Sequence, residues 1–224
     1  HDPELTGANR NIGLVYFGDW KIQTWFDSPY PLPDTRVGVE YAASVTNQQQ
    51  CSNLPSLFVC EKCFEYDTEF VVWAQHQSSC TCDSPPGRKV YHRGDTRIWE
   101  IDGDENELYC QNVSLFGKFF LSVEPTSVDV QDYFFYVLVR AKDGKEDIIG
   151  FFSKEKAPRG EHNISWLVIF PQWQRSRYGT LMIEFSYELS RRVGKVGGPG
   201  RPLTSLGLRG YLSYWVATLV RFFR

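Results

Sequence analysis

The sequence lacks several features that would place it in a familiar class of protein. It carries 24 Lys and Arg against 27 Asp and Glu, a formal net charge of −3, so it lacks the broad basic face of a nucleic-acid-binding domain. Its aromatic, Arg-rich ending at residues 209–224 is too short and too charged to span a bilayer. We expect a terminal helix packed on its own domain there, with a membrane-surface helix as the alternative.

A secretory origin is also not expected. The first residues contain no apolar signal-like stretch, although six cysteines and two Asn-x-Ser sequons, at Asn112 and Asn163, would suit a secreted protein. Asn163 lies in an apolar segment that should be core, so both sequons are interpreted as chance. With 42% hydrophobic residues, the chain is expected to be globular, reduced and intracellular.

One group of cysteines has metal-ligand spacing. Cys60, Cys63, His76 and Cys80 form a C-x2-C-x12-H-x3-C pattern, and three thiolates with one imidazole can close a tetrahedral structural zinc site. Cys82 is the competing fourth ligand, because a His-x5-Cys spacing is also permissible.

A second pattern follows later in the chain. Residues 162–170 are β-branched and aromatic, as in a buried strand, and Pro171 ends them. Leu181, Met182, Phe185, Leu189 and Val193 then recur at helical spacing up to Gly194. The loop between them therefore lies at a helix N-terminus, where free N–H groups and the helix dipole suit an anionic group such as a pyrophosphate.

The stretch from Phe170 to Trp215 resembles the MYST family of lysine acetyltransferases, and the resemblance extends from about Asn11. Matching segments include Ser28-Pro29-Tyr30-Pro31, the C2HC spacing, and Pro85-Pro86-Gly87. It implies an α+β fold: a MYST/GNAT-like acetyltransferase core with a mixed central sheet and an N-terminal C2HC zinc finger. We expect an aromatic hairpin and loop at 1–56 (the loop at about 32–53), the finger at 57–88 and the acetyltransferase core at 89–224.

Three catalytic positions of the family are changed in this chain. Gly200 stands where the family has the Glu that acts as general base, Trp166 where it has the active-site Cys, and Glu124 where it has the Lys that it acetylates on itself. The resemblance therefore implies that no catalytic residue of the family remains at these positions.

The loop that the family uses for acetyl-CoA, of the form Q-R-x-G-x-G, is changed as well. Arg177 replaces the central Gly, whose positive φ brings backbone N–H groups to the phosphates. Its guanidinium either closes the loop or itself binds phosphate. The candidate cofactor-binding residues are Gln174, Arg175, Ser176, Arg177, Gly179, Thr180 and Thr204.

We therefore expect a MYST-type histone acetyltransferase-like domain that is impaired or inactive and serves as a chromatin-associated binding or scaffold module. One alternative is an active histone lysine acetyltransferase with a relocated base, such as Glu155 or His162; another is a non-catalytic acyl-CoA-binding regulator. The implied cofactor is structural zinc, with acetyl-CoA binding doubtful. The implied partners are subunits of chromatin or histone-modifying complexes and histone tails, with no sequence-specific nucleic acid and no membrane, and the implied location is the nucleus.

Overall fold

The computed structural model describes residues 10–32, 54–122, 129–142, 144–157, 162–201 and 203–224. The predicted loop at 32–53 falls almost wholly outside these residues, and so does Glu124.

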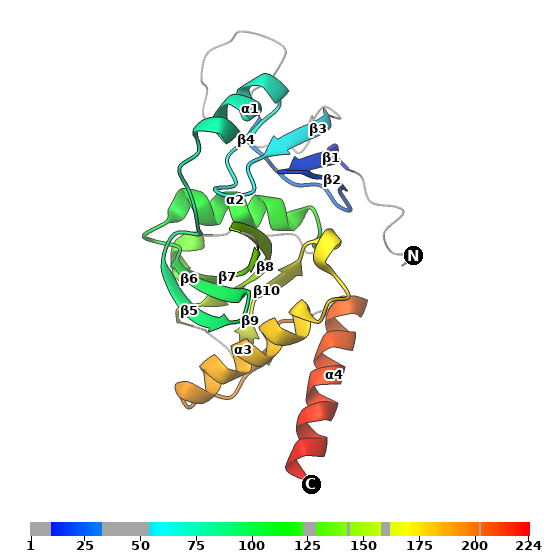
Figure 1. Cartoon of the computed structure of the whole chain (residues 1–224). Helices are drawn as coiled ribbons and strands as arrows, with labels where there is room; N and C mark the ends of the chain where they lie inside the picture. Colours follow the sequence, from blue (N-terminus) through cyan, green and yellow to red (C-terminus); the bar gives the residue numbers. More distant parts are fainter. Residues whose placement is uncertain (1–9, 33–53, 123–128, 143, 158–161, 202) are drawn as a thin grey trace.

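The described residues form three sheets and four α-helices (Figure 1). The strands are β1 (Ile12–Phe17), β2 (Trp20–Gln23), β3 (Leu54–Val59), β4 (Tyr66–Asp67), β5 (Arg88–Arg93), β6 (Thr96–Asp102), β7 (Tyr133–Lys142), β8 (Lys145–Glu155), β9 (His162–Ile164), β10 (Trp166–Ile169) and β11 (Gly198–Pro199). The helices are α1 (Phe70–Ser79), α2 (Glu107–Lys118), α3 (Tyr178–Arg192) and α4 (Ser205–Phe222), with short 3-10 helices η2 (Val130–Asp132) and η3 (Pro171–Trp173).

The N-terminal module is a four-stranded sheet in the order β2-β1-β3-β4, with α1 beside it. β1 forms the predicted aromatic hairpin with β2 and pairs in parallel with β3. Apolar side chains of this sheet, such as Val15 and Leu57, are fully buried in one cluster with Phe116 of α2. Because they share that core, α2 lies between the N-terminal module and the main sheet (Figure 1).

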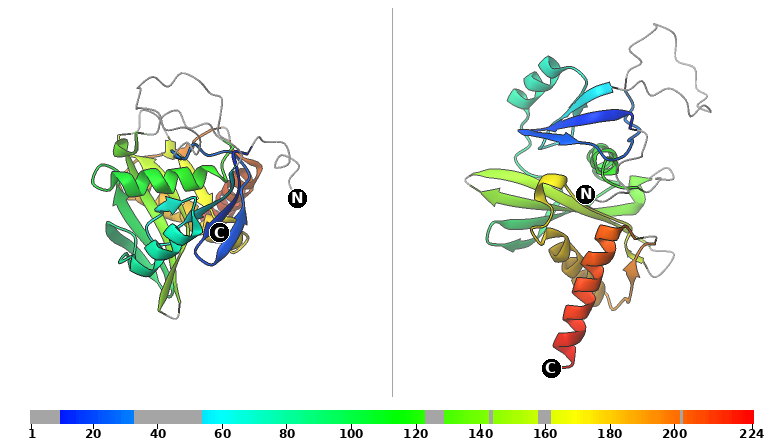
Figure 2. Two further views of the ribbon diagram at one scale, coloured as in Figure 1. Left: turned by 90° about the horizontal axis from the view of Figure 1, so that it is seen from above. Right: turned by 90° about the vertical axis from the view of Figure 1, so that its right-hand side faces the viewer.

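The main sheet has the order β10-β8-β7-β6-β5, with antiparallel neighbours. Phe135 and Phe151 belong to the α2 cluster, whereas Phe152 of the same sheet packs with Met182 and Phe185 of α3. Side chains alternate between the two faces of a strand, so each face has its own core. The α+β fold is thus confirmed: one sheet separates α2 and the N-terminal module from α3 and α4 (Figure 2).

The main local predictions are confirmed, with one difference. β7 and β8 form a hairpin in which Lys142 opposes Lys145 and Gly144 has a φ of +80°; Asp143 lies outside the described residues. The predicted strand at 162–170 is instead two strands. The N–H of Ser165, between the two strands, donates to the Ser153 carbonyl. β10 pairs with β8, whereas β9 pairs in parallel with β11.

The last helix packs on its own domain only in part. Tyr211 is buried, and the indole N–H of Trp215 donates to the Tyr187 hydroxyl at 2.9 Å, which holds α4 against α3. The C-terminal half extends away from the body (Figure 2), and its Val216 and Phe222 are exposed. In the part of the chain that the structure describes, none of the helices combines the length and apolarity needed to cross a membrane.

Candidate metal centre and cofactor loop

The backbone after β3 turns sharply and presents two cysteines. Cys60 donates its N–H to the Glu65 carbonyl at 2.8 Å and accepts the Phe64 N–H at 3.0 Å, and Phe64 itself has a φ of +61°. The other two predicted ligands lie near the end of α1, where Cys80 donates its N–H to the His76 carbonyl at 2.8 Å. A tight turn and a helix end therefore face each other across a small gap.

The four predicted metal ligands come together in this gap. The ligand atoms of Cys60, Cys63, His76 and Cys80 all lie within 4.8 Å of one another. The Cys80 sulfur is 3.9 Å from those of Cys60 and Cys63, and the Cys63 sulfur is 3.2 Å from His76 Nε2. Tetrahedral zinc with Zn–S bonds of about 2.3 Å places two sulfurs about 3.8 Å apart, so the spacing fits such an ion. The exposed Cys82 is not part of the group that the described residues form.

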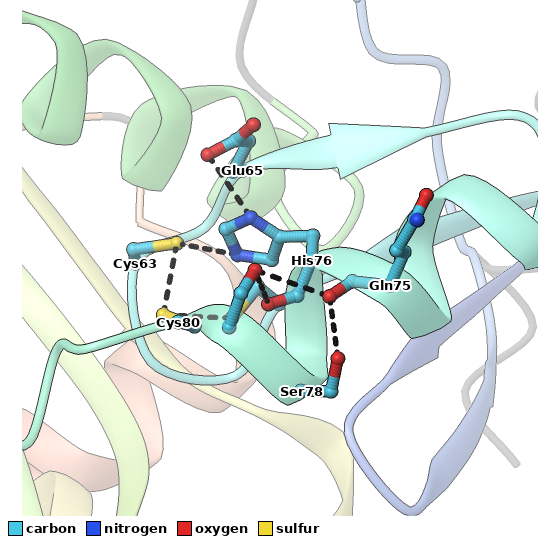
Figure 3. A network of polar contacts seen from close by, with 8 residues as sticks. Cys63, Glu65, Gln75, His76, Ser78 and Cys80 are labelled. Atoms are coloured by element: carbon cyan, nitrogen blue, oxygen red, sulfur yellow. Dashed lines mark hydrogen bonds and ion pairs between the residues drawn. The ribbon is translucent and has the colours of Figure 1, made fainter.

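A neighbouring carboxylate completes the centre. Glu65 Oε2 lies 3.3 Å from His76 Nδ1, on the opposite side of the ring from Cys63 (Figure 3). A carboxylate at this place fixes the ring orientation and leaves Nε2 as the donor to a metal. A hydrogen bond from Cys63 lowers the pKa of Cys60 to about 5, so the turn already favours one thiolate. The sequence analysis did not single out Glu65.

The candidate cofactor loop links η3 to α3. The Gln174 side chain turns back and donates to the Ile169 carbonyl at 2.9 Å, and residues 175–177 are exposed. The first helical hydrogen bond of α3 runs from the Leu181 N–H to the Arg177 carbonyl at 3.1 Å. No acidic residue lies in the first turn of α3. This end of the helix therefore keeps the positive potential expected for an anion-binding loop.

Arg177 lies in the left-handed region of backbone conformation, which glycine adopts more readily than other residues. It is the N-cap of α3 with φ +64° and ψ 6°, and Arg175 also has a positive φ of +62°. A left-handed conformation costs a non-glycine residue roughly 1–2 kcal/mol. The turn at Arg175 and Arg177 therefore carries an energetic cost, and Arg177 adds a long cationic side chain to it.

The other candidate cofactor residues have ordinary structural surroundings. Gly179 and Thr180 lie in the first turn of α3, and a Cβ at Gly179 would meet Ile169 at an ordinary 3.7 Å. Thr204 is the N-cap of α4, where its hydroxyl accepts the Gly207 N–H at 3.1 Å.

Two of the positions that the family resemblance marks as catalytic lie at the break between β9 and β10. Gly200 follows β11 and donates its N–H to the Ile164 carbonyl at 3.1 Å, and Trp166 begins β10 opposite Ser153. A Cβ added to Gly200 would lie 3.4 Å from the Ile164 carbonyl oxygen and 3.7 Å from that of Ser165. These are ordinary contact distances, so the backbone at position 200 admits the Cβ of a residue other than glycine.

The candidate replacement bases lie on either side of this junction. Glu155 is the last residue of β8, and the Tyr133 hydroxyl lies 3.5 Å from its Oε1. His162 is exposed and pairs with Gly198, two residues before Gly200. Both stand on strands next to the junction, and neither occupies the Gly200 position.

A buried polar network lies between β8, β9 and α3, next to this junction. Asn163 is 2% exposed; its Oδ1 accepts from the Lys154 ammonium at 2.7 Å and from the Ser190 hydroxyl at 2.8 Å. Its amide donates to Ser186 at 3.0 Å, which ties β9 to β8 and α3. This burial confirms that Asn163 is a core residue. The sequence analysis did not predict the network, because single Ser and Lys residues carry no signal of their partners.

Comparison with known proteins identifies both parts of the chain. Residues 84–224 match the MOZ/SAS family, and residues 9–80 match the MYST family zinc finger domain. Histone acetyltransferase KAT6B of Macaca fascicularis is 36% identical over 215 residues, covering 96% of this chain and 11% of the relative. Histone acetyltransferase KAT6A of Rattus norvegicus is 35% identical over 219 residues, covering 98% of this chain and 10% of the relative.

A shorter relative gives the same result. Histone acetyltransferase esa-1 of Neurospora crassa is 36% identical over 219 residues, covering 98% of this chain and 40% of the relative. The chain thus spans well under half the length of each of these curated relatives.

Proposed function

The chain belongs to the MYST (MOZ/SAS) family of histone acetyltransferases, and we propose that it is a catalytically impaired or inactive member serving as a chromatin-associated binding or scaffold module. The observation that carries this proposal is the junction of β9, β10 and β11. There the backbone admits a Cβ at position 200, but the residue is glycine and supplies no carboxylate.

The chemistry explains why this position matters. Acetyl transfer to lysine requires a neutral amine, and at pH 7 a free lysine with a pKa of about 10.4 is neutral in only about one molecule in 2,500. A positioned general base typically contributes about 10²–10⁴ in rate. Gly200 supplies no carboxylate, so we expect the rate of acetyl transfer to be lower by a factor of that size.

Trp166 acts in the same direction. It is half-buried at the start of β10, close to Gly200. The family resemblance implies a small thiol here, and in the proposed protein the larger indole would add bulk where acetyl group and lysine would meet. The proposal therefore rests on two neighbouring changes that both oppose transfer.

The Arg177 side chain in the cofactor loop is compatible with loss of catalysis and also with binding of acetyl-CoA. Arg177 retains the backbone turn but extends an exposed guanidinium from it. If the loop accepted acetyl-CoA, the N–H groups at the start of α3 and the Arg177 side chain would hold its phosphates, and the cofactor would supply the acetyl group. A non-catalytic acyl-CoA-binding regulator is therefore the second candidate function, supported by the retained turn.

The metal centre belongs to the structural part of the proposal. We infer that Cys60, Cys63, His76 and Cys80 hold one zinc ion, because all four protein positions of a tetrahedral site are filled. A site with four protein ligands leaves no open position for water or substrate. The proposed zinc therefore stabilises the N-terminal module.

The remaining parts of the proposal concern context. Relatives named as histone acetyltransferases support histone tails and subunits of histone-modifying complexes as partners, and the nucleus as the location. We propose the division into 1–56, 57–88 and 89–224 as the domain organisation, although β1 pairs with β3 across the first boundary.

The test combines binding and turnover. Isothermal titration with acetyl-CoA should give no binding or weak binding, and transfer of a labelled acetyl group to histone peptides should stay at the background rate. Tight binding without transfer would favour the regulator. Efficient transfer that depends on Glu155 or His162 would favour the active enzyme with a relocated base.

A further inference from the structure

A shallow depression lies where the N-terminal module meets the main sheet. The β1–β2 turn, the turn between Cys60 and Cys63, the start of β8 and η3 form its wall. The space within it that a water molecule could occupy is only about 10 Å³. Sites for drug-sized molecules usually occupy about 300–1,000 Å³, so the depression admits only the tip of a side chain.

The depression is built around an ammonium group. Lys145 Nζ donates to Asp19 Oδ2 at 3.0 Å, and Glu61 and Asp147 also line the wall. The hydrogen bond to Asp19 raises the pKa of Lys145 above its ordinary value, and the charges of all three carboxylates add to this effect. Asp147 is already paired with Arg140 at 2.9 Å, and Glu61 accepts from Gln77 at 2.6 Å.

The bond between Asp19 and Lys145 is a weak one. The Asp19 side chain is 87% exposed and the Lys145 side chain 50% exposed. Exposed ion pairs of this kind contribute about 0–1 kcal/mol. An external ammonium could therefore replace that of Lys145 at little cost.

Aromatic rings line the same wall. Trp20 is 44% exposed, and its ring centroid lies 5.8 Å from that of Trp173. The Arg140 guanidinium lies 4.2 Å from the centroid of the Trp173 ring, so one of these rings already holds a cation. Proteins build sites for cationic side chains from two components, carboxylates and the exposed face of an aromatic ring, and both are present here.

An unpaired amide gives an independent sign of a ligand. Gln172 lines the depression, and both polar atoms of its side chain are buried without a hydrogen-bond partner among the described residues. Buried amide groups are usually hydrogen-bonded, because an unmade bond costs about 1–3 kcal/mol. Because both atoms are shielded from solvent, a peptide backbone would supply their donor and acceptor only after the Gln172 side chain turns toward the depression.

We propose that this depression binds a lysine side chain of an extended basic peptide, which displaces Lys145 from Asp19 and packs its methylene stem on Trp20. The inference deepens the proposed binding function by naming a peptide site, but it does not depend on the loss of catalysis. It involves neither the cofactor loop nor the Gly200 junction.

The test measures the affinity of the intact protein for a fluorescein-labelled peptide with three lysines spaced by glycine and serine, using fluorescence anisotropy. Asp19→Asn and Trp20→Ala should each weaken binding about threefold or more. Lys145→Ala should strengthen it by up to about threefold, because it removes the internal competitor. The same peptide with its lysines acetylated should bind much more weakly.

Matched variants control for net charge and exposed aromatic area. Asp104→Asn and Lys195→Ala make the same charge changes at exposed positions outside the depression, and Phe222→Ala removes an exposed ring from α4. The proposal is overturned if Asp19→Asn behaves like Asp104→Asn, or if Lys145→Ala behaves like Lys195→Ala. Titration of the unmodified protein with acetyl-CoA, and an acetyl-transfer assay, report separately on the proposed loss of catalysis.

Discussion

Replacing Cys80 with Ser should destabilise the whole N-terminal module. The metal centre is coupled to the core through Phe64, which lies between Cys63 and Glu65, is fully buried, and has its ring centroid 5.2 Å from that of Phe17. If loss of the metal releases this turn, both Phe64 and Phe17 lose their burial. Burying one such side chain contributes about 1.5–3 kcal/mol, so the two together amount to about 3–6 kcal/mol.

This loss can be measured as a melting temperature. For a chain of this length 1 kcal/mol corresponds to a shift of about 2–4 °C, so Cys80→Ser should melt at least about 6 °C below the unmodified protein. Metal analysis should find one zinc per chain in the unmodified protein and much less in the variant. Zinc binding and folding are linked in such sites, so a chelator should produce a similar shift in the unmodified protein.

Cys82 provides a matched control, because Cys82→Ser makes the same chemical change two residues away. It should retain the zinc content and melting temperature of the unmodified protein. The reasoning is refuted if Cys80→Ser keeps its metal and its stability, or if Cys82→Ser loses both to the same extent.

Three further variants test other parts of the structure. Arg177→Gly should not lower the free energy of unfolding, because glycine relieves about 1 kcal/mol of left-handed strain. In calorimetric titration this variant should bind acetyl-CoA more tightly than the unmodified protein if Arg177 closes the loop. Weaker binding by the variant would show that Arg177 contacts phosphate. Asn163→Ala should lower the free energy of unfolding in urea by about 3 kcal/mol, because it leaves the half-buried Lys154 ammonium without its main acceptor; a loss below about 1 kcal/mol would contradict this role. Thr204→Ala should cost about 1 kcal/mol by removing the cap on the Gly207 N–H, and an unchanged urea midpoint would refute it.

The fold was predicted from the resemblance to the MYST family, whereas α3 and most of the ligand group were predicted from local patterns. Apolar spacing in residues 181–193 predicted α3. Spacing alone predicted Cys60, Cys63 and His76 as metal ligands and left Cys80 and Cys82 as alternatives for the fourth ligand.

Other features depend on contacts between distant segments, which a single sequence does not reveal. The break at Ser165 arises because β9 pairs with β11, more than thirty residues later. Glu65, Asn163 and the depression around Lys145 could not be predicted for the same reason: Asp19 and Lys145 are 126 residues apart in sequence. Sequence could name the changed residues at Gly200 and Trp166, but only the structure could place them at one junction.

The most direct test of the central proposal is the rate of acetyl transfer to histone peptides by the unmodified protein and by Gly200→Glu. The proposal predicts that the unmodified protein transfers acetyl groups at the background rate. Circular dichroism of Gly200→Glu should first show that this variant is folded, since the backbone is known to admit only the Cβ of the new side chain. A rate typical of enzymes in the unmodified protein, on the order of 1 s⁻¹, left almost unchanged in Gly200→Glu, would contradict the proposal and show that another residue serves as the base.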